Sequence, residues 1–311
     1  MSSQTSLLLG LDIGGTKSAA IIGDWDGNVL ARVSALTSPG SWQEAVDVLF
    51  GLLREVCRQS GYDCVQMTGL GVSCGGPLDS ATGIVYAPPN LPHWEAVPLK
   101  ALLADEFGLP VFIENDANAT ALAEHRWGAG QNCRDMAFLT MGTGIGAGLI
   151  LDGQLYRGRR DLAGEVGHAT LLPDGPLCPC GKRGCLEALA SGTAIGQRGR
   201  ERYGEEDITT ETICARARLG EPTARKILAE AAFWMGIGLA NLLQTLNLER
   251  IVLGTLAVHA ADLLLEPIRE AARAHCWPRV WEGVSIVPAA LGDAAQDKAA
   301  LAVALATFEK S

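Results

Sequence analysis

One short loop concentrates side chains that commonly bind metal ions. Residues 164–187 read GEVGHATLLPDGPLCPCGKRGCLE, where three cysteines have C-x-C-x4-C spacing and a histidine stands ten residues before the first of them. Thiolates and imidazole are the preferred ligands of structural zinc, and four of them complete a tetrahedral shell. The spacing therefore predicts a closed zinc site of His168, Cys178, Cys180 and Cys185. The alternatives are buried free thiols or a disulfide between two of the three cysteines.

Two glycine-rich stretches are candidate phosphate loops. They read DIGGTK at 12–17 and GTGIGAG at 142–148. Glycine at a tight corner lets backbone N–H groups approach an anion, and Asp12 at a strand end could hold Mg²⁺ directly or through water. Neither stretch has the Walker or Rossmann spacing, so either loop alone is equally well explained as a structural turn. Their recurrence at corresponding places in the two halves favours phosphate binding.

An Asn-Asp pair lies between a predicted strand and a predicted helix, in FIENDANATALAE. Either Asn115 or Asp116 could simply cap the helix. The alternative is catalytic, because phosphoryl transfer to an alcohol needs a carboxylate within reach of the attacking hydroxyl. Asn115 could then donate and accept hydrogen bonds toward a sugar.

The pattern of strands and turns occurs twice along the chain. Residues 6–30 and 136–156 both read as strand, glycine turn, strand, Asp-Gly turn and strand. Helices are predicted at 41–59, with Ser41 as N-cap and Glu44 as its capping-box partner, and at 99–107, ended by Gly108. The remaining predicted elements are strands at 67–74, 110–114, 250–254 and 284–289, and helices at 117–128, 221–246, 260–275 and 293–308. This order predicts a duplicated α/β domain, with two lobes and a small-molecule cleft between them.

Composition narrows the possible partners and the compartment. The chain has 311 residues and a formal net charge of −10, which argues against nucleic acid as a main partner. We see no export signal and no uninterrupted apolar run of membrane length, so we expect a cytoplasmic protein without a membrane partner. The six cysteines outside the loop are scattered, and we expect them to be buried small side chains: Cys57, Cys64, Cys74, Cys133, Cys214 and Cys276.

Taken together, these motifs resemble those of the ROK family of sugar kinases, over nearly all of the chain. The motifs, in the family's order, are DIGGTK, APPNLPHW, ENDANATALAE, GTGIGAG, GEVGH and CPCGKRGCLE. The resemblance implies an actin-like ATPase fold (ribonuclease H-like), with ATP·Mg²⁺ as donor, a hexose as acceptor and a structural Zn²⁺ on the four ligands above. It implies Asp116 as catalytic base, which also lies at the sugar site, and further sugar contacts at Gly75, Asn90, Asn115, Glu165, His168 and Glu187. It implies ATP contacts at Asp12, Gly14, Gly15, Thr16, Lys17, Gly142, Thr143, Gly144 and Gly254.

The resemblance also suggests why the two acids are attached to the cysteine loop. One nitrogen of His168 could bind zinc while the other donates to a sugar hydroxyl. If the metal fixes the loop, Glu165 and Glu187 are held ready to accept hydrogen bonds from the sugar. Because all four ligands come from protein, the metal would not activate water.

We expect an N-terminal lobe at 1–116, a C-terminal lobe at 117–295 and a helix at 296–311 that packs back on the first lobe. The expected activity is phosphorylation of the 6-hydroxyl of glucose. N-acetylmannosamine kinase is the alternative, and fructokinase and allose kinase are further options. A sugar-binding regulator is the alternative outside enzymes. The resemblance further implies a homodimer. One departure is Thr255, which follows Gly254 where the family often has a second glycine and which would narrow the nucleotide site.

Overall fold

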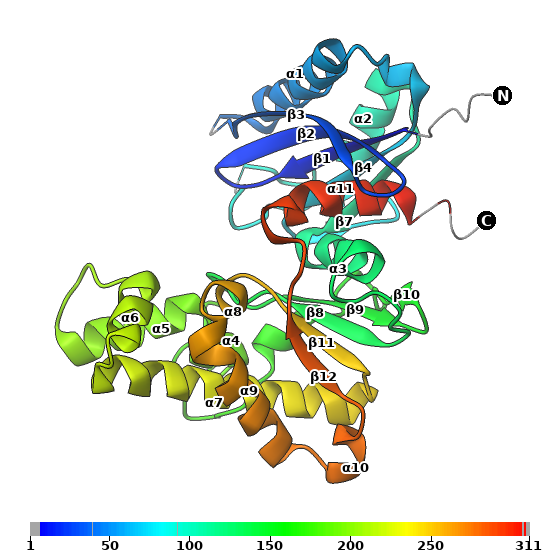
Figure 1. The fold of residues 1–311 in the computed structure, drawn as a ribbon. Coiled ribbons are helices and arrows are strands. Elements are labelled where there is room, and N and C mark those ends of the chain that lie inside the picture. Colours follow the sequence, from blue (N-terminus) through cyan, green and yellow to red (C-terminus); the bar gives the residue numbers. More distant parts are fainter. Residues whose placement is uncertain (1–6, 39, 92, 307, 309–311) are drawn as a thin grey trace. The chain divides into compact units, whose positions relative to one another are not determined.

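The structure is a computed structural model that describes residues 7–38, 40–91, 93–306 and 308. Contacts divide the chain into two compact units, each built on its own five-stranded sheet (Figure 1). The first unit comprises Met1–Gln131, Arg157–Leu162 and Leu291–Ser311, and the second comprises Asn132–Tyr156 and Ala163–Ala290. The predicted α/β class is therefore confirmed. Residues 307 and 309–311 of the predicted C-terminal segment lie outside the described residues.

The sheet of the first unit has the order β3-β2-β1-β4-β7. Strands β1, β2 and β3 form an antiparallel meander, and β4 and β7 continue the sheet parallel to β1. The strands are β1 (Leu7–Ile13), β2 (Lys17–Asp24), β3 (Val29–Leu36), β4 (Met67–Cys74) and β7 (Val111–Asn115), with a separate short pair β5 (Leu78–Asp79) and β6 (Ile84–Val85).

Alternating side chains of β1 supply two cores on opposite faces of this sheet. Leu9 and Leu11 pack in the cluster that contains α1 (Trp42–Ser60) and α2 (Leu99–Phe107). Leu8 packs instead against α11 (Ala295–Leu305), in red on the opposite face (Figure 1). Because successive side chains of a strand point to opposite faces, β1 contacts a helical layer on each face of the sheet.

Local signals at the helix ends are confirmed. The Ser41 hydroxyl accepts from the Glu44 N–H at 3.3 Å, and the Glu44 carboxylate accepts from the Ser41 N–H at 3.0 Å. Gly108 ends α2 in the left-handed conformation with φ 64°. These are short-range interactions, so the sequence pattern is enough to predict them.

The sheet of the second unit, β10-β9-β8-β11-β12, repeats the topology of the first. Again three strands form an antiparallel meander and two more continue parallel to its first strand. The strands are β8 (Met136–Leu139), β9 (Ala147–Leu151), β10 (Gln154–Leu155), β11 (Arg250–Leu253) and β12 (Ser285–Pro288). The matching orders agree with the duplication predicted from the sequence.

Helices α4 to α7 lie between β10 and β11 in the chain. The sequence pattern predicted α7 but not α4, α5 or α6. The helices of this unit are α4 (Leu186–Ala190), α5 (Gly192–Tyr203), α6 (Thr210–Arg218), α7 (Pro222–Leu246), α8 (Leu256–His259), α9 (Ala261–His275) and α10 (Pro278–Trp281). By length and composition, α7 is apolar enough to cross a membrane. Its buried residues, such as Met235 and Leu239, nevertheless belong to the unit's core, together with residues of α6 and α9.

The boundary between the units lies after Gln131, beyond the boundary expected after residue 116. Helix α3 (Asp116–Trp127) stays with the first unit because its alanines pack against α11. The segment Arg157–Leu162 also belongs to the first unit. Asp161 accepts the N–H and the hydroxyl of Ser80 at 2.8 and 3.0 Å, and Arg157 pairs with the buried Glu114.

One expectation about the cysteines is wrong. Cys57 and Cys64 form a disulfide between the end of α1 and the turn that follows, with 5.9 Å between their Cα atoms. Their scattered positions gave no sign of this pairing, which depends on how the chain turns back at Gly61. The other four scattered cysteines are buried, as expected: Cys74, Cys133, Cys214 and Cys276.

We predict that Gly71→Ala will destabilise the first unit. A Cβ atom at this position in β4 would lie 2.1 Å from the Ala300 oxygen and 2.3 Å from the Ala304 nitrogen, and these backbone atoms of α11 cannot turn aside. The free energy of unfolding, measured in urea, should fall by about 3 kcal/mol. The matched control is Gly51→Ala in α1, which has open space and should stabilise by about 1 kcal/mol. Equal midpoints for Gly71→Ala and the native chain would contradict this packing.

Candidate active site

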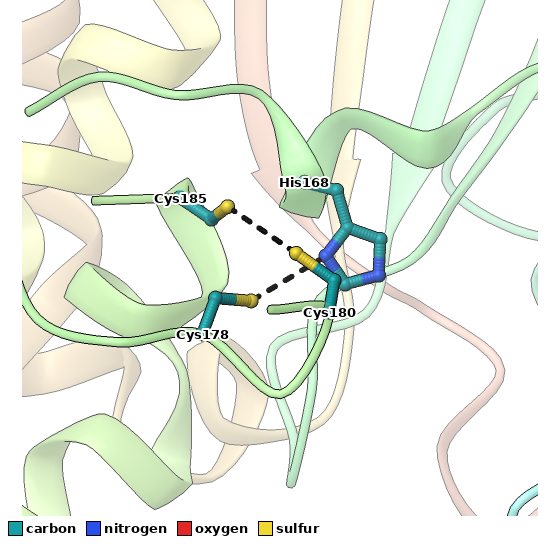
Figure 2. Close-up of side chains that lie close together, drawn as sticks. All are labelled: His168, Cys178, Cys180 and Cys185. Carbon is teal, nitrogen blue, oxygen red and sulfur yellow. Dashed lines mark hydrogen bonds between the residues drawn. The ribbon is translucent and has the colours of Figure 1, made fainter. Parts of the chain in front are cut away.

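Four side chains of the second unit converge in the way the cysteine spacing predicted (Figure 2). One potential ligand atom from each of His168, Cys178, Cys180 and Cys185 lies within 4.8 Å of all the others. Gly181 and Gly184 take left-handed φ values of 86° and 64°, which allows the sharp turns between the cysteines. Cys185 also forms the N-cap of α4, so the cluster is joined directly to that helix.

The spacing of these atoms fits one tetrahedral metal ion. Cys180 Sγ and Cys185 Sγ are 3.7 Å apart, and Cys178 Sγ is 3.6 Å from His168 Nδ1. With metal–sulfur bonds of about 2.3 Å and metal–nitrogen bonds of about 2.05 Å, tetrahedral geometry requires about 3.8 and 3.6 Å. Disulfide sulfurs would be only about 2.05 Å apart. The residues therefore fit a divalent cation such as zinc, with Nδ1 of His168 as its ligand.

The turn that carries His168 rests directly on the backbone of the second glycine loop and β9. A Cβ atom at Gly164 would lie 2.0 Å from the Ala147 oxygen, and one at Gly167 would lie 2.0 Å from the Ile145 oxygen. Only glycine permits this approach. The 3-10 turn Glu165–His168 is thereby fixed. His168 Nε2 lies 3.9 Å from Glu165 Oε2, on the side of the ring away from the cysteines, so these two predicted sugar-binding groups are adjacent.

Glu187, the third predicted acceptor of this unit, also contacts the second glycine loop. Its Oε2 accepts a hydrogen bond from the Ile145 N–H at 2.9 Å. Its Oε1 lies 3.9 Å from Cys178 Sγ. The structure therefore brings Glu187 together with the metal-ligand cluster and with the loop at 142–148.

A cavity of about 640 Å³ lies within the second unit, and the first residues of this loop help to line it. This volume lies within the range of small-molecule and cofactor sites. Its lining includes Gly142, Thr143, Thr193, Arg200, Thr255 and His259. Two of the predicted nucleotide residues, Gly142 and Thr143, therefore line a cavity large enough for a nucleotide.

Gly144 and Gly254, the other predicted nucleotide residues of the second unit, are not among the residues that line this cavity. Gly144 faces Glu187, since a Cβ there would lie 2.4 Å from Glu187 Oε2. Gly254 packs against Phe138, because a Cβ atom at Gly254 would lie 2.8 Å from Cζ of that ring. Thr255 lines the cavity with φ 52° and ψ −113°, a conformation that β-branched residues rarely adopt. Such local strain is concentrated at functional sites.

Acidic side chains gather around Asp12 in the first unit. Burial raises the pKa of Asp12 to about 6, and the nearby Asp297 and Asp116 add to the rise. Arg32 and the Ser73 hydroxyl oppose this shift. Grouped carboxylate oxygens are what Mg²⁺ prefers as ligands, so the environment of Asp12 fits the predicted cation.

Helix capping does not account for Asp116. Asn115 is the N-cap of α3 and accepts from the Ala117 N–H at 2.9 Å. Asp116 Oδ1 shares that N–H at 2.8 Å, and Oδ2 accepts no hydrogen bond from the described residues. Asp116 is exposed as a residue, and the protein atoms packed around its carboxyl group displace water and raise its pKa. The carboxylate is thus positioned to accept a proton from a ligand.

Gly15 and Gly75, two of the remaining predicted residues of the first unit, lie next to Asn90. Gly15 packs against Asn90 so closely that a Cβ there would lie 2.4 Å from Asn90 Cβ. A Cβ at Gly75 would lie 3.6 Å from Asn90 Nδ2, and one at Gly76 would lie 3.0 Å from Asn115 Nδ2.

The first glycine loop is closed by a hydrogen bond from the Gly14 N–H to the Lys17 oxygen at 3.1 Å. Thr16 and Lys17 are exposed at the tip of this loop.

Sequence reasoning missed the ion pair beside Asp12 and most of the cavity lining. Arg32 Nε donates to both oxygens of Asp297, at 3.0 and 2.9 Å, although 265 positions separate them. The only sequence signal was one acid ahead of the apolar run of α11. Some of the missed cavity residues, such as Thr193, lie on α5, and others, such as Cys214, lie on α6. The sequence pattern revealed neither helix.

Comparison with known proteins identifies relatives of this chain. The chain is 33% identical over 308 residues to a glucokinase of Streptomyces coelicolor, covering 93% of this chain and 94% of that one. It is 34% identical over 276 residues to a xylose repressor of Caldicellulosiruptor bescii, covering 85% and 69%. A ROK-family glucokinase of Streptomyces griseus, solved with glucose and AMPPNP, matches with a TM-score of 0.80 and 34% identity, covering 96% and 99%.

Solved structures of ROK sugar kinases, such as that glucokinase, have the actin-like ATPase fold. The two units of this chain, with their repeated sheet order, conform to this fold. The family profile described as "ROK family" matches residues 8–307, which is nearly the whole chain. The chain belongs to the ROK family.

Proposed function

We propose that this protein is an ATP-dependent hexose kinase that phosphorylates the 6-hydroxyl of glucose, with Asp116 as general base. The observation that carries the proposal is the carboxylate of Asp116, with one oxygen free, beside a helix cap that Asn115 already provides. Its raised pKa supports this role, because a base whose pKa approaches the working pH is more effective.

The chemistry needs one proton transfer and one phosphoryl transfer. The sugar oxygen attacks the γ-phosphorus of ATP while the bond from that phosphorus to the β–γ bridging oxygen breaks, releasing ADP. Asp116 takes the proton from the attacking hydroxyl. On the sugar side we assign hydrogen bonds to Gly75, Asn90 and Asn115 in the first unit, and to Glu165, His168 and Glu187 in the second.

For the donor, we assign ATP to the 640 Å³ cavity of the second unit, with Gly142 and Thr143 beside the phosphates. The AMPPNP in the related glucokinase supports a nucleotide donor. In the first unit we assign the loop of Gly14, Gly15, Thr16 and Lys17 to the phosphates. Mg²⁺, held by Asp12, would neutralise charge on the phosphate oxygens.

We assign a structural Zn²⁺ to His168, Cys178, Cys180 and Cys185. Its proposed role is to fix the loop from which the sugar ligands project. The His168 ring supports this division of labour, since Nδ1 faces the cysteines while Nε2 remains available as a donor. From the family resemblance we also propose a cytoplasmic homodimer, for which sedimentation velocity at micromolar concentration is the direct measurement.

We predict that a screen of hexoses and N-acetylhexosamines with ATP·Mg²⁺ will give the highest kcat/KM for glucose. The glucokinase relatives support glucose as acceptor. A maximum for N-acetylmannosamine would keep the kinase and change the acceptor. The xylose repressor relative supports a regulator as the alternative. Sugar binding without phosphorylation of any acceptor would reject the enzyme in favour of that alternative.

We predict that Asp116→Asn will lower kcat by about 10²- to 10⁴-fold, as expected for removal of a general base. The amide keeps the shape of the side chain, and Asn115 still caps α3, so sugar affinity should change little. Steady-state kinetics and calorimetric titration separate the two effects. The matched control is Asp105→Asn, an exposed acid on α2, which should have native rates. Near-native turnover of Asp116→Asn would show that Asp116 is not the base.

We predict about one zinc ion per purified chain by elemental analysis, and loss of that ion in Cys180→Ala. Three ligands hold zinc more weakly than four, and a loosened loop displaces the sugar ligands. A displacement near 1 Å can lower the rate about a hundredfold. The matched control is Cys276→Ala, a free cysteine of the same unit outside the cluster, which should keep its zinc. Full kinase activity of metal-free native protein would reject the proposed role of zinc.

A further inference from the structure

The second glycine loop contacts the segment 187–193 at three points. Glu187 Oε2 accepts from the Ile145 N–H at 2.9 Å. The Gly192 N–H donates to the Gly142 oxygen at 2.8 Å, and Thr193 Oγ1 donates to the Thr143 oxygen at 2.8 Å. The conformation of the loop is therefore tied to α4 and to the start of α5.

The contact with Glu187 divides the loop into two parts. Gly142 and Thr143 line the large cavity, whereas Gly144 and Ile145 do not. The Ile145 N–H is already bonded to a carboxylate, whose negative charge would repel a phosphate at the same place. The carboxylate can sit there only because residue 144 has no side chain, since a Cβ would lie 2.4 Å from Oε2.

The same part of the loop supports the other acceptor groups of this unit. A Cβ atom at Gly167 would lie 2.0 Å from the Ile145 oxygen. A Cβ atom at Gly164 would lie 2.0 Å from the Ala147 oxygen. The turn with Glu165 and His168 is thus stacked on residues 145–147. Both sets of candidate sugar ligands in the second unit rest on this short stretch of backbone.

We propose that Gly144 and the Ile145 N–H are positioning groups for the acceptor sugar, which act by holding Glu187. The N–H fixes Oε2. Among the described residues, the hydrogen-bonding group that reaches Oε1 is Cys178 Sγ, at 3.9 Å, so Oε1 can accept a sugar hydroxyl. A carboxylate that is already ordered loses less rotamer freedom when the sugar binds. Residues 142–143 then serve the nucleotide and residues 144–145 serve the sugar. The inference rests on the proposed sugar kinase function.

The first test is Gly144→Ala. The added methyl group meets the far end of a flexible side chain, so Glu187 can swing away without a shift of the backbone. We expect the dissociation constant for glucose to rise by about tenfold or more, while that for a non-hydrolysable ATP analogue changes by less than about threefold. Both constants are measured by calorimetry on the full chain. The matched control is Gly142→Ala, whose methyl would lie 3.3 Å from Thr255 Cγ2 on the cavity side. It should change analogue binding and leave glucose binding unaffected.

A double-mutant cycle separates positioning from a general disturbance of the loop. In the Glu187→Ala background, Gly144→Ala should have no further effect on the glucose constant, because the carboxylate it displaces is gone. Gly142→Ala should keep its full effect on the analogue in that background. If Gly144→Ala by itself lowers the thermal midpoint, Glu187→Ala should restore it by removing the clash.

Three outcomes would overturn the inference. They are equal loss of glucose and analogue binding in Gly144→Ala, fully additive effects of Gly144→Ala and Glu187→Ala on glucose, and an unaltered glucose constant in Gly144→Ala. If the native chain phosphorylates glucose and any of these outcomes is observed, the inference is rejected and the proposed function stands. A native chain that phosphorylates no sugar rejects the proposed function, and the inference with it.

Discussion

The arrangement of the second unit depends on backbone packing that is too close for any side chain. Gly164 and Gly167 lie against the carbonyl oxygens of Ala147 and Ile145, where a Cβ atom would come within 2.0 Å. This packing holds the turn with Glu165 and His168 on the hairpin between β8 and β9. His168 in turn supplies the nitrogen for the cysteine cluster, and Cys185 of that cluster begins α4. Metal ligands, acidic side chains and glycine loop therefore form one connected structure.

A similar constraint operates in the first unit, with a different result. Gly71 allows the backbone of α11 to lie directly on β4. A Cβ atom at Gly10 of β1 would lie 3.1 Å from Ala300 Cβ. Because α11 lies so close to the sheet, Asp297 near its start reaches Arg32 of β3. That pair lies near enough to Asp12 to alter its pKa, with Asp297 raising it and Arg32 lowering it. The packing of the last helix thus contributes to the electrostatics of the proposed cation site.

The two units share a sheet topology, but they carry different chemical groups. In the first unit the sheet ends at β7, which runs directly into α3 and presents Asn115 and Asp116. In the second unit, the long stretch between β10 and β11 adds the metal-ligand loop and helices α4 to α7. This stretch supplies the cysteines, Glu187 and most of the cavity lining. The duplicated framework accordingly presents the proposed base and a group of carboxylates in one unit, and the His-Cys cluster and a cavity in the other.

The sequence by itself determined the features that depend on neighbouring residues. The apolar run at the start of the chain predicted the strand β1, and Ser41 with Glu44 predicted the start of α1. The cysteine spacing predicted the cluster with His168, because its members lie within one loop. Such features need only the local geometry of the chain. Repetition of the hairpin pattern predicted a duplicated α/β domain, and the two sheets have matching strand orders.

The tertiary structure alone decided which distant groups meet. The Arg32–Asp297 pair, the Cys57–Cys64 disulfide and the hydrogen bond from Ile145 to Glu187 follow no periodic pattern. Gly144 and Gly254 lie so close to Glu187 and Phe138 that a side chain at either position would meet them. Pairings of this kind depend on how whole elements pack, and hydrophobic burial drives that packing without regard to sequence distance. A local pattern therefore indicates which residues can do chemistry, while the packed fold decides which partners they have.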